Sequence, residues 1–221
     1  MTCYAPGGYC DQWTCAVDGK CAWPPQPAVA WAGEFGDEYA KRSPGDPAAN
    51  KALFAKALKA TERVKRVLEL GCGTGANLMA LRDLLPGVQL RAVEINPSAA
   101  AIARASGFEV LEQSLLEHQC TGYDLAFTKG VLIHIPPEHL SQAYDRLYQG
   151  SWRYILVAEY YNPTPMEIIY RGRRGMLWKR DFAGELLARY PEDLRLVDYG
   201  FVYHGDKDPQ DDLTWFLLEK N

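Results

Sequence analysis

The sequence predicts an α/β protein with a mostly parallel sheet, and two observations support this prediction. Short apolar runs, which suit buried strands, alternate along the chain with segments whose apolar residues have helical spacing. One of these runs, residues 67–70, passes into a turn that contains Gly71, Gly73 and Gly75, and helical spacing follows over 76–85. A strand, a glycine turn and a helix in this order are typical of folds that hold a ligand at the carboxyl ends of parallel strands.

Two acidic residues lie near this turn in positions that suit a ligand. Glu69 precedes the first glycine by two residues, where its carboxylate could meet a cationic or amine-bearing group. Glu94 ends the next apolar run, where a ribose diol lies in a doubly wound sheet. The glycines lack the Cβ atoms that would block a ligand against the backbone. The spacing is G-x-G-x-G rather than G-x-G-x-x-G, so a dinucleotide-binding turn and a purely structural turn are the weaker alternatives.

The segment from Glu69 to Gly75 resembles the cofactor loop of class I S-adenosylmethionine-dependent methyltransferases. The resemblance implies a three-layer, Rossmann-like fold whose mostly parallel seven-stranded sheet ends in an antiparallel C-terminal hairpin. It implies S-adenosylmethionine as cofactor, S-adenosylhomocysteine as product, and no metal. Ser114 stands where related enzymes carry an acid or amide beside the adenine. The residues implied to bind the cofactor are Tyr39, Arg42, Glu69, Gly71, Gly73, Gly75, Asn77, Glu94, Ile95, Ser114, Leu115 and Lys129.

The remaining elements are expected in chain order from their apolar periodicity. Asp46 is expected to cap a helix that has Pro47 at its first position. Helices are expected over 47–63, 96–105, 137–148 and 182–190. Strands are expected over 90–95, 108–111, 124–127 and 152–158, and two antiparallel strands over 194–201 and 214–219.

Composition indicates one globular domain and gives no sign of a macromolecular or membrane partner. The chain has 221 residues and a net charge of −4, so bulk attraction to nucleic acid or an anionic membrane is not expected. No apolar run approaches the ~20 residues that cross a bilayer, and the N-terminus lacks a secretory pattern. We therefore expect a cytoplasmic protein with a methyltransferase domain over 31–221, in which 31–63 form a lid and a helix.

Residues 1–30 form a separate arm that is rich in cysteine and proline. The cysteine spacing is C-x6-C-x4-C-x5-C, whereas zinc ribbons usually contain C-x2-C pairs. A flexible or partner-bound arm is favoured over a metal site or disulfides, and the prolines at 24–27 predict a stiff linker. The arm could exchange between the subunits of a homodimer. Its cysteines are Cys3, Cys10, Cys15 and Cys21.

Residues 31–42 are aromatic and charged, and two interpretations are open. They could form a surface helix that packs Trp31 and Phe35 on the core, or a lid over the cofactor. The lid is favoured because class I methyltransferases commonly cover the cofactor with residues before the first strand. Tyr39 and Arg42 would share one helical face, so that Arg42 could clamp the cofactor carboxylate and Tyr39 could face the methyl group.

The ends of the fourth and fifth strands and the segment after them supply the candidates for the methyl acceptor. His134 follows the fourth strand and is interpreted either as a core residue or as an acceptor-facing base. Glu159 and Tyr161 follow the fifth strand and are expected to contact the substrate. Five cations then occur in ten residues, which predicts an anion-binding surface unless the run is a solvated loop. These cations are Arg171, Arg173, Arg174, Lys179 and Arg180.

Longer blocks sharpen the resemblance over residues 31–204. The blocks WAGEFGDEYAKR, VLELGCGTGANL, YDLAFTKGVLIHIPPEHL, AEYYNPTPMEIIYRGRRGMLWKRDF and DYGFVYH are similar to methylases associated with pseudaminic acid biosynthesis. They are also similar to the phosphonate O-methyltransferase of dehydrophos biosynthesis, an antibiotic pathway. By motif, the catalytic tyrosine, arginine and lysine of the latter would be Tyr39, Arg171 and Lys179, with Arg173 as a further anion contact. A phosphonate acceptor is favoured, and the alternative is O- or N-methylation of a nonulosonic sugar, with His134 or Glu159 as the base.

Overall fold

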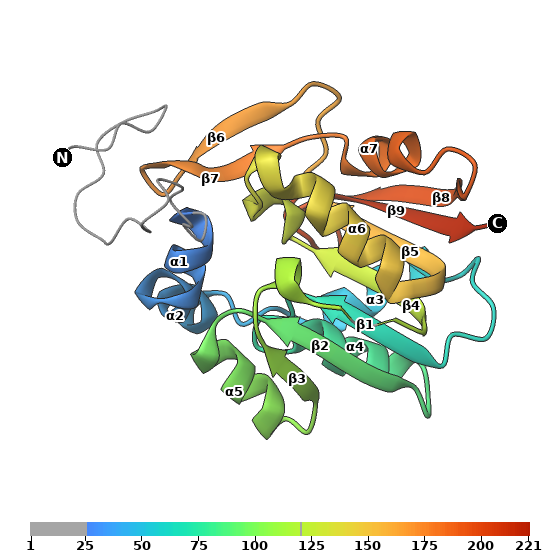
Figure 1. Ribbon diagram of the computed structural model, residues 1–221. Coiled ribbons are helices and arrows are strands. Elements are labelled where there is room, and N and C mark those ends of the chain that lie inside the picture. Colours follow the sequence, from blue (N-terminus) through green and yellow to red (C-terminus); the bar gives the residue numbers. More distant parts are fainter. Residues whose placement is uncertain (1–25, 120) are drawn as a thin grey trace.

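A computed structural model describes residues 26–119 and 121–221 and shows a seven-stranded sheet with helices on both faces (Figure 1). The strand order is β3-β2-β1-β4-β5-β9-β8. The first five strands pair in parallel, and β9 runs antiparallel to both of its neighbours, which confirms the predicted fold class. The strands are β1 (Arg66–Leu70), β2 (Gln89–Glu94), β3 (Glu109–Glu112), β4 (Tyr123–Lys129), β5 (Ser151–Glu159), β8 (Leu194–Val202) and β9 (Leu213–Lys220).

Seven α-helices and three short 3-10 helices occur in the described residues. Asp46 caps α3 by accepting hydrogen bonds from the backbone N–H groups of Ala48 and Ala49, as its position before Pro47 predicts. The α-helices are α1 (Gln26–Ala32), α2 (Glu34–Arg42), α3 (Pro47–Ala57), α4 (Ala76–Leu84), α5 (Pro97–Ala105), α6 (Leu140–Gly150) and α7 (Phe182–Arg189). The 3-10 helices are η1 (Leu115–Glu117), η2 (Leu132–His134) and η3 (Pro137–His139).

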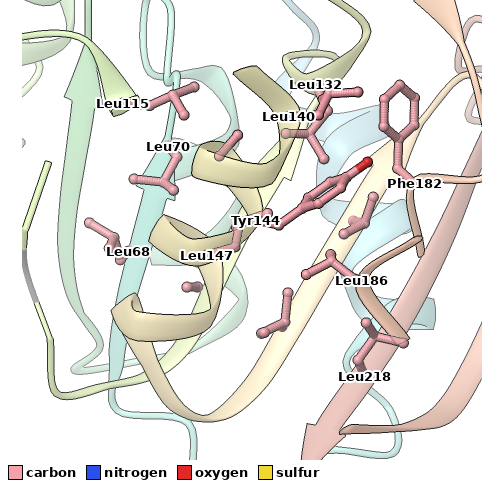
Figure 2. Packing of buried hydrophobic residues seen from close by; sticks show 14 of the residues in the cluster. Leu68, Leu70, Leu115, Leu132, Leu140, Tyr144, Leu147, Phe182, Leu186 and Leu218 are labelled. Carbon is pink, nitrogen blue, oxygen red and sulfur yellow. The ribbon is translucent and has the colours of Figure 1, made fainter. Parts of the chain in front are cut away.

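The central strand β1 is buried on both faces, and the alternation of its side chains decides which of the two cores each residue joins. Leu68 and Leu70 belong to the core beneath α6 and α7, where Figure 2 shows them beside Tyr144 and Leu147. Val67 belongs to the opposite core, which also contains Leu53 and Phe54 of α3 and Leu81 of α4. Because successive side chains of a strand point to opposite faces, Glu69 shares the face of Val67 and lies against α4.

Four predicted segments differ from the structure in their form or boundaries. The expected lid helix is two helices, because the chain turns at Gly33 between α1 and α2. Pro27 lies in the first turn of α1 rather than in a linker, a place that suits proline because it has no N–H to leave unpaired. The helix expected to reach residue 63 ends at Ala57, and residues 58–60 form a turn. The segment expected as one helix from 137 begins as η3 and continues as α6.

The cationic run, which sequence reasoning did not assign to a strand, forms an antiparallel hairpin of β6 (Met166–Tyr170) and β7 (Arg173–Lys179). Arg171 and Gly172 connect the strands with φ angles of 49° and 76°. Positive φ at both central residues suits the twist of a two-residue hairpin. Glycine, as at 172, adopts such angles readily, whereas arginine, as at 171, rarely does. Figure 1 shows the hairpin outside the main sheet, beside α1. Arg174 and Lys179 therefore belong to a strand, and Arg171 to its turn.

Residues 26–30, expected to belong to the N-terminal arm, form the start of α1, whereas the expectations for the rest of the arm, its four cysteines and an exchange between subunits lie outside the described residues. Over 26–119 and 121–221 no helix is both long enough and apolar enough to span a bilayer. Within the same residues no group of three or more histidine, cysteine, aspartate or glutamate side chains could hold a metal ion.

Candidate active site

A cavity lies at the carboxyl ends of β1, β2 and β4, where the sheet topology places ligands in α/β folds. Its volume is about 220 Å³. Ten of the residues predicted from the sequence line it: Tyr39, Gly71, Gly73, Asn77, Glu94, Ile95, Ser114, Leu115, Lys129 and His134. Eight do not line it: Arg42, Glu69, Gly75, Glu159, Tyr161, Arg171, Arg173 and Lys179. Trp31, Asn50, Asn96 and Gln113 also line it and were not expected.

The three glycines of the turn have two different reasons to lack a side chain. All have positive φ, with values of 87°, 53° and 90° for Gly71, Gly73 and Gly75. A Cβ atom at Gly71 would lie 2.7 Å from Val131, and one at Gly75 would lie 3.2 Å from Ala103. A Cβ atom at Gly73 would meet no atom within 4 Å. Gly73 therefore leaves room for a ligand against the backbone, whereas Gly71 and Gly75 allow close packing.

The carboxylate of Glu94 is held at the cavity wall by backbone donors. One oxygen accepts a hydrogen bond of 2.7 Å from the N–H of Gly73, and the other accepts one of 2.8 Å from the N–H of Asn96. Burial raises the pKa of Glu94, and these backbone hydrogen bonds oppose that shift. The side-chain amide of Asn96 donates to the carbonyl of Trp31, at 3.1 Å, and so joins the glycine turn to the lid. Asn96 precedes a proline, which is a helix-start signal rather than a site signal, so the sequence did not reveal this role.

Glu69 is fully buried and does not line the cavity, but it contacts a residue that does. One carboxylate oxygen accepts a 2.6 Å hydrogen bond from the amide of Asn77, which lines the cavity. Burial raises the pKa of Glu69 to about 8, and the hydrogen bond from Asn77 opposes the shift. The other oxygen of Glu69 and the amide oxygen of Asn77 are buried without a hydrogen-bond partner among the described residues. Buried acceptors rarely stay unpaired, so this corner of the cavity fits a donor such as the amine of an amino-acid ligand.

His134 lines the cavity, and its tautomer is fixed by a hydrogen bond to the backbone. Its Nδ1 atom lies 2.6 Å from the backbone carbonyl oxygen of Met176, which can only accept, so Nδ1 carries the proton. The Nε2 atom is then the acceptor. Burial lowers the pKa of His134 to about 4, so the ring is neutral near pH 7. The rings of Trp31 and Tyr170 lie 4.5 Å and 5.4 Å away between centroids.

Glu159 holds the loop that carries His134 and does not line the cavity. Its oxygens accept hydrogen bonds from the N–H groups of Val131 and Leu132, both at 3.1 Å, and of Ile133 at 3.4 Å. Burial raises the pKa of Glu159 to about 7, and these donors oppose the shift. This placement differs from the substrate contact expected from the sequence, because both oxygens are turned toward the loop backbone. The side chain of Glu159 therefore positions η2.

The lid and the hairpin meet around the ring of Phe35. The Arg173 guanidinium lies 5.1 Å from the centroid of this ring, and the ring of Tyr170 lies 6.1 Å away. Arg42 lies 5.6 Å from the same ring and pairs with Glu38 at 4.0 Å, so it stays outside the cavity. Arg42 does not line the cavity, and its role as a clamp for the cofactor carboxylate stays a prediction. Arg173 and Tyr170 instead bring the cationic hairpin to the lid beside the cavity.

Lys179 is the last residue of β7, and Tyr161 follows the end of β5 by two residues. The Lys179 ammonium lies 5.1 Å above the ring of Tyr160, whose hydroxyl donates to the carboxylate of Asp211. Tyr161 is 41% exposed and packs against Phe216, 5.7 Å between centroids. The structure thus brings Lys179 to the β5 end of the site and does not bring Tyr161 to the cavity.

The fold is that of class I S-adenosylmethionine-dependent methyltransferases. Residues 68–151 match the family model described as a methyltransferase domain. A 94-residue segment is 30% identical to trans-aconitate 2-methyltransferases of Mycobacterium tuberculosis and Mycobacterium bovis, and it covers 41% of this chain and 36% of each relative. The chain thus matches about a third of the length of these relatives.

Solved structures show the same fold over nearly the whole chain. Magnesium protoporphyrin IX methyltransferase of Synechocystis, with bound S-adenosylmethionine, is 15% identical with a TM-score of 0.67, covering 91% of this chain and 100% of that one. The 1,6-didemethyltoxoflavin N1-methyltransferase of Burkholderia thailandensis, with bound S-adenosylhomocysteine, is 19% identical with a TM-score of 0.69, covering 93% of each chain. These likenesses concern the fold alone.

Proposed function

We propose that this chain is an S-adenosylmethionine-dependent O-methyltransferase of a small anionic metabolite, with a phosphonate as the best candidate and a methyl ester as the product. One observation carries this proposal. The ring of Tyr170, the last residue of β6 in the cationic hairpin, lies 5.4 Å between centroids from the ring of His134, which lines the cavity, so the hairpin borders the cavity without lining it. Cations that border the cavity would suit an acceptor with a negative charge.

The relatives support an anionic acceptor without identifying it. The matched enzymes are named for trans-aconitate, a carboxylate, and methylation at carboxylate oxygen also gives an ester. The blocks shared with the phosphonate O-methyltransferase family include the hairpin that carries Arg171, Arg173 and Lys179. Carboxylate and phosphonate present similar forked oxygens, which guanidinium groups bind in pairs.

The residues of the chain mainly have to align the acceptor and exclude water. When bound, the cofactor supplies a methyl group that is already activated on a sulfonium. An ionised phosphonate or carboxylate oxygen needs no strong base, so no proton has to move. Arg171, Arg173 and Lys179 would hold the oxygens that do not attack, because cations on the attacking oxygen would weaken it as a nucleophile. Tyr39, which lines the cavity on the lid side, would orient the acceptor.

A hydroxyl or amine acceptor, as in a nonulosonic sugar or its precursor, is the second candidate. The observation in its favour is the state of His134, which is neutral and has Nε2 as its acceptor atom. Such a nitrogen can take the proton of a hydroxyl or ammonium group as the methyl is transferred. Glu159 is the weaker base candidate here, because its oxygens already accept hydrogen bonds from the loop backbone.

Methyl transfer from labelled S-adenosylmethionine to a panel of small molecules tests the proposal. The panel holds phosphonates, phosphates, carboxylates that include trans-aconitate, sugar hydroxyls and amines. Transfer confined to the anions is the expected result, and alkali-labile methyl label in the product would identify an ester. Transfer to sugar hydroxyls or amines alone, with every anion inert, would overturn the anionic acceptor in favour of the second candidate.

A further inference from the structure

A second cavity adjoins the first, and part of its wall is the loop between β8 and β9. Gly45, Asn50 and Lys129 line both cavities, whereas residues 209–211 of the loop line only the second. Gln210 of this loop donates a hydrogen bond of 3.1 Å to the side-chain oxygen of Asn50, which fastens the loop to α3. The loop therefore belongs to the walls of the site, although no residue of it was expected there from the sequence.

Asp211 is the carboxylate that this loop brings to the site. One of its oxygens accepts a hydrogen bond from the hydroxyl of Tyr160, and the other accepts none from the described residues. Burial raises the pKa of Tyr39, which lines the first cavity, and the nearby groups of Tyr170 and Asp211 add to this rise. Burial lowers the pKa of Lys129, and carboxyl groups that include Asp211 oppose this fall. Asp211 therefore acts on residues of both cavities.

The ring of Tyr160 separates this carboxylate from a cation of the hairpin. The Lys179 ammonium lies 5.1 Å from the centroid of the ring, and the hydroxyl of the same ring holds Asp211. Neither Lys179 nor Asp211 forms an ion pair with another described residue. Two opposite charges that stay apart across one ring suit a ligand that carries both charges.

An acceptor with negative charge alone would suit this arrangement poorly. The carboxylate of Asp211 repels a second negative group placed beside it and attracts a positive one. Asp46, the other acid that lines the second cavity, is engaged as the cap of α3. A ligand whose anion meets the hairpin cations and whose far end reaches Asp211 is therefore held best when that end is positive.

We propose that Asp211 binds an ammonium group of the acceptor, which is then a zwitterion with its anion at the hairpin and its amine at the second cavity. This inference rests on the proposed anionic acceptor and names its chemical class more closely. An ammonium group beside a carboxylate keeps its proton and has no free electron pair. The methyl group therefore still goes to an oxygen of the anion.

Three phosphonates that differ only in their far end test this contact through methyl transfer from labelled S-adenosylmethionine. Aminoethylphosphonate ends in an ammonium group, propylphosphonate in a methyl group and phosphonopropionate in a carboxylate. We expect kcat/KM of the wild-type chain to be about 3- to 10-fold higher for the ammonium probe than for the methyl probe, and lowest for the carboxylate probe. Asp211→Asn keeps the size of the side chain and an acceptor for Tyr160, and should bring the first ratio near one. Asp208→Asn, in the same loop but lining neither cavity, should leave it unchanged.

The possible outcomes separate this inference from the proposed function. Equal use of the ammonium and methyl probes by the wild-type chain would overturn the inference alone, as would a preference that Asp211→Asn retains or that Asp208→Asn also loses. A weaker affinity of Asp211→Asn for S-adenosylhomocysteine would assign the carboxylate to the cofactor instead. Alkali-stable label on the ammonium probe would place the methyl group on nitrogen and would also overturn it. If the wild-type chain bound S-adenosylhomocysteine but methylated none of the three probes, the phosphonate acceptor would fail, and this inference with it.

Discussion

Substitution of two glycines by alanine should separate the packing role of the turn from its binding role. Gly71→Ala places a methyl group 2.7 Å and 2.9 Å from the two Cγ atoms of Val131. Rotation of this β-branched side chain cannot remove both contacts, and Glu159 holds the backbone of Val131. Overpacking costs about 1–3 kcal/mol, and left-handed backbone costs about 1–2 kcal/mol for a residue other than glycine. We therefore expect Gly71→Ala to lower the free energy of unfolding by about 2–5 kcal/mol.

Gly73→Ala should cost little stability but should weaken binding of the proposed cofactor. Its φ of 53° lies within the left-handed region, and its new methyl group would meet no protein atom within 4 Å. The loss of unfolding free energy should be only about 1–2 kcal/mol, whereas the methyl group projects into the space proposed for the cofactor. Urea unfolding of the ligand-free proteins gives the first quantity, and calorimetric titration with S-adenosylhomocysteine gives the second. Equal stability losses in the two variants, or wild-type affinity in Gly73→Ala, would refute this reasoning.

Three further results are expected. Burial raises the pKa of Glu69 from 4.5 to about 8, so the folded chain binds more protons than the unfolded chain between these pH values. The free energy of unfolding should therefore fall as the pH rises from 5 to 8. Glu69→Gln should flatten this fall, measured as urea midpoints over the same pH range. His134→Ala should spare transfer to an ionised phosphonate but slow transfer to a hydroxyl by about 10²–10⁴ in kcat. Arg173→Ala should raise the KM of an anionic acceptor about tenfold, whereas Arg174→Ala, at the neighbouring position on the opposite face of β7, should leave it unchanged.

Each of these results has an outcome that contradicts it. An unchanged pH profile in Glu69→Gln would mean that this carboxyl is not the group that titrates. Equal effects of His134→Ala on both acceptor types would indicate that the ring shapes the site and does not accept a proton. Equal KM changes in Arg173→Ala and Arg174→Ala would show a diffuse charge effect, which added salt should then abolish in both variants.

The sequence by itself determined the features that short windows of residues encode. The strand, glycine turn and helix at 66–84 and the cap at Asp46 were predicted because apolar period, turn glycines and capping side chains act within a few residues. The position of Glu94 followed from the same local pattern, since a strand end in a parallel sheet faces the cavity. The order of the strands was available only through the resemblance to a known family.

Tertiary structure alone decided the parts that depend on residues far apart in the chain. The tautomer of His134 is set by a carbonyl 42 residues away, and Glu159 is turned from the cavity by amides 26 to 28 residues away. The hairpin could not be predicted from its cationic sequence, because charged residues have low strand propensity and the turn has an arginine at positive φ. Lys129 lines two cavities, the second of which is also lined by residues 209–211, and no local pattern encodes this meeting because packing between distant segments creates it.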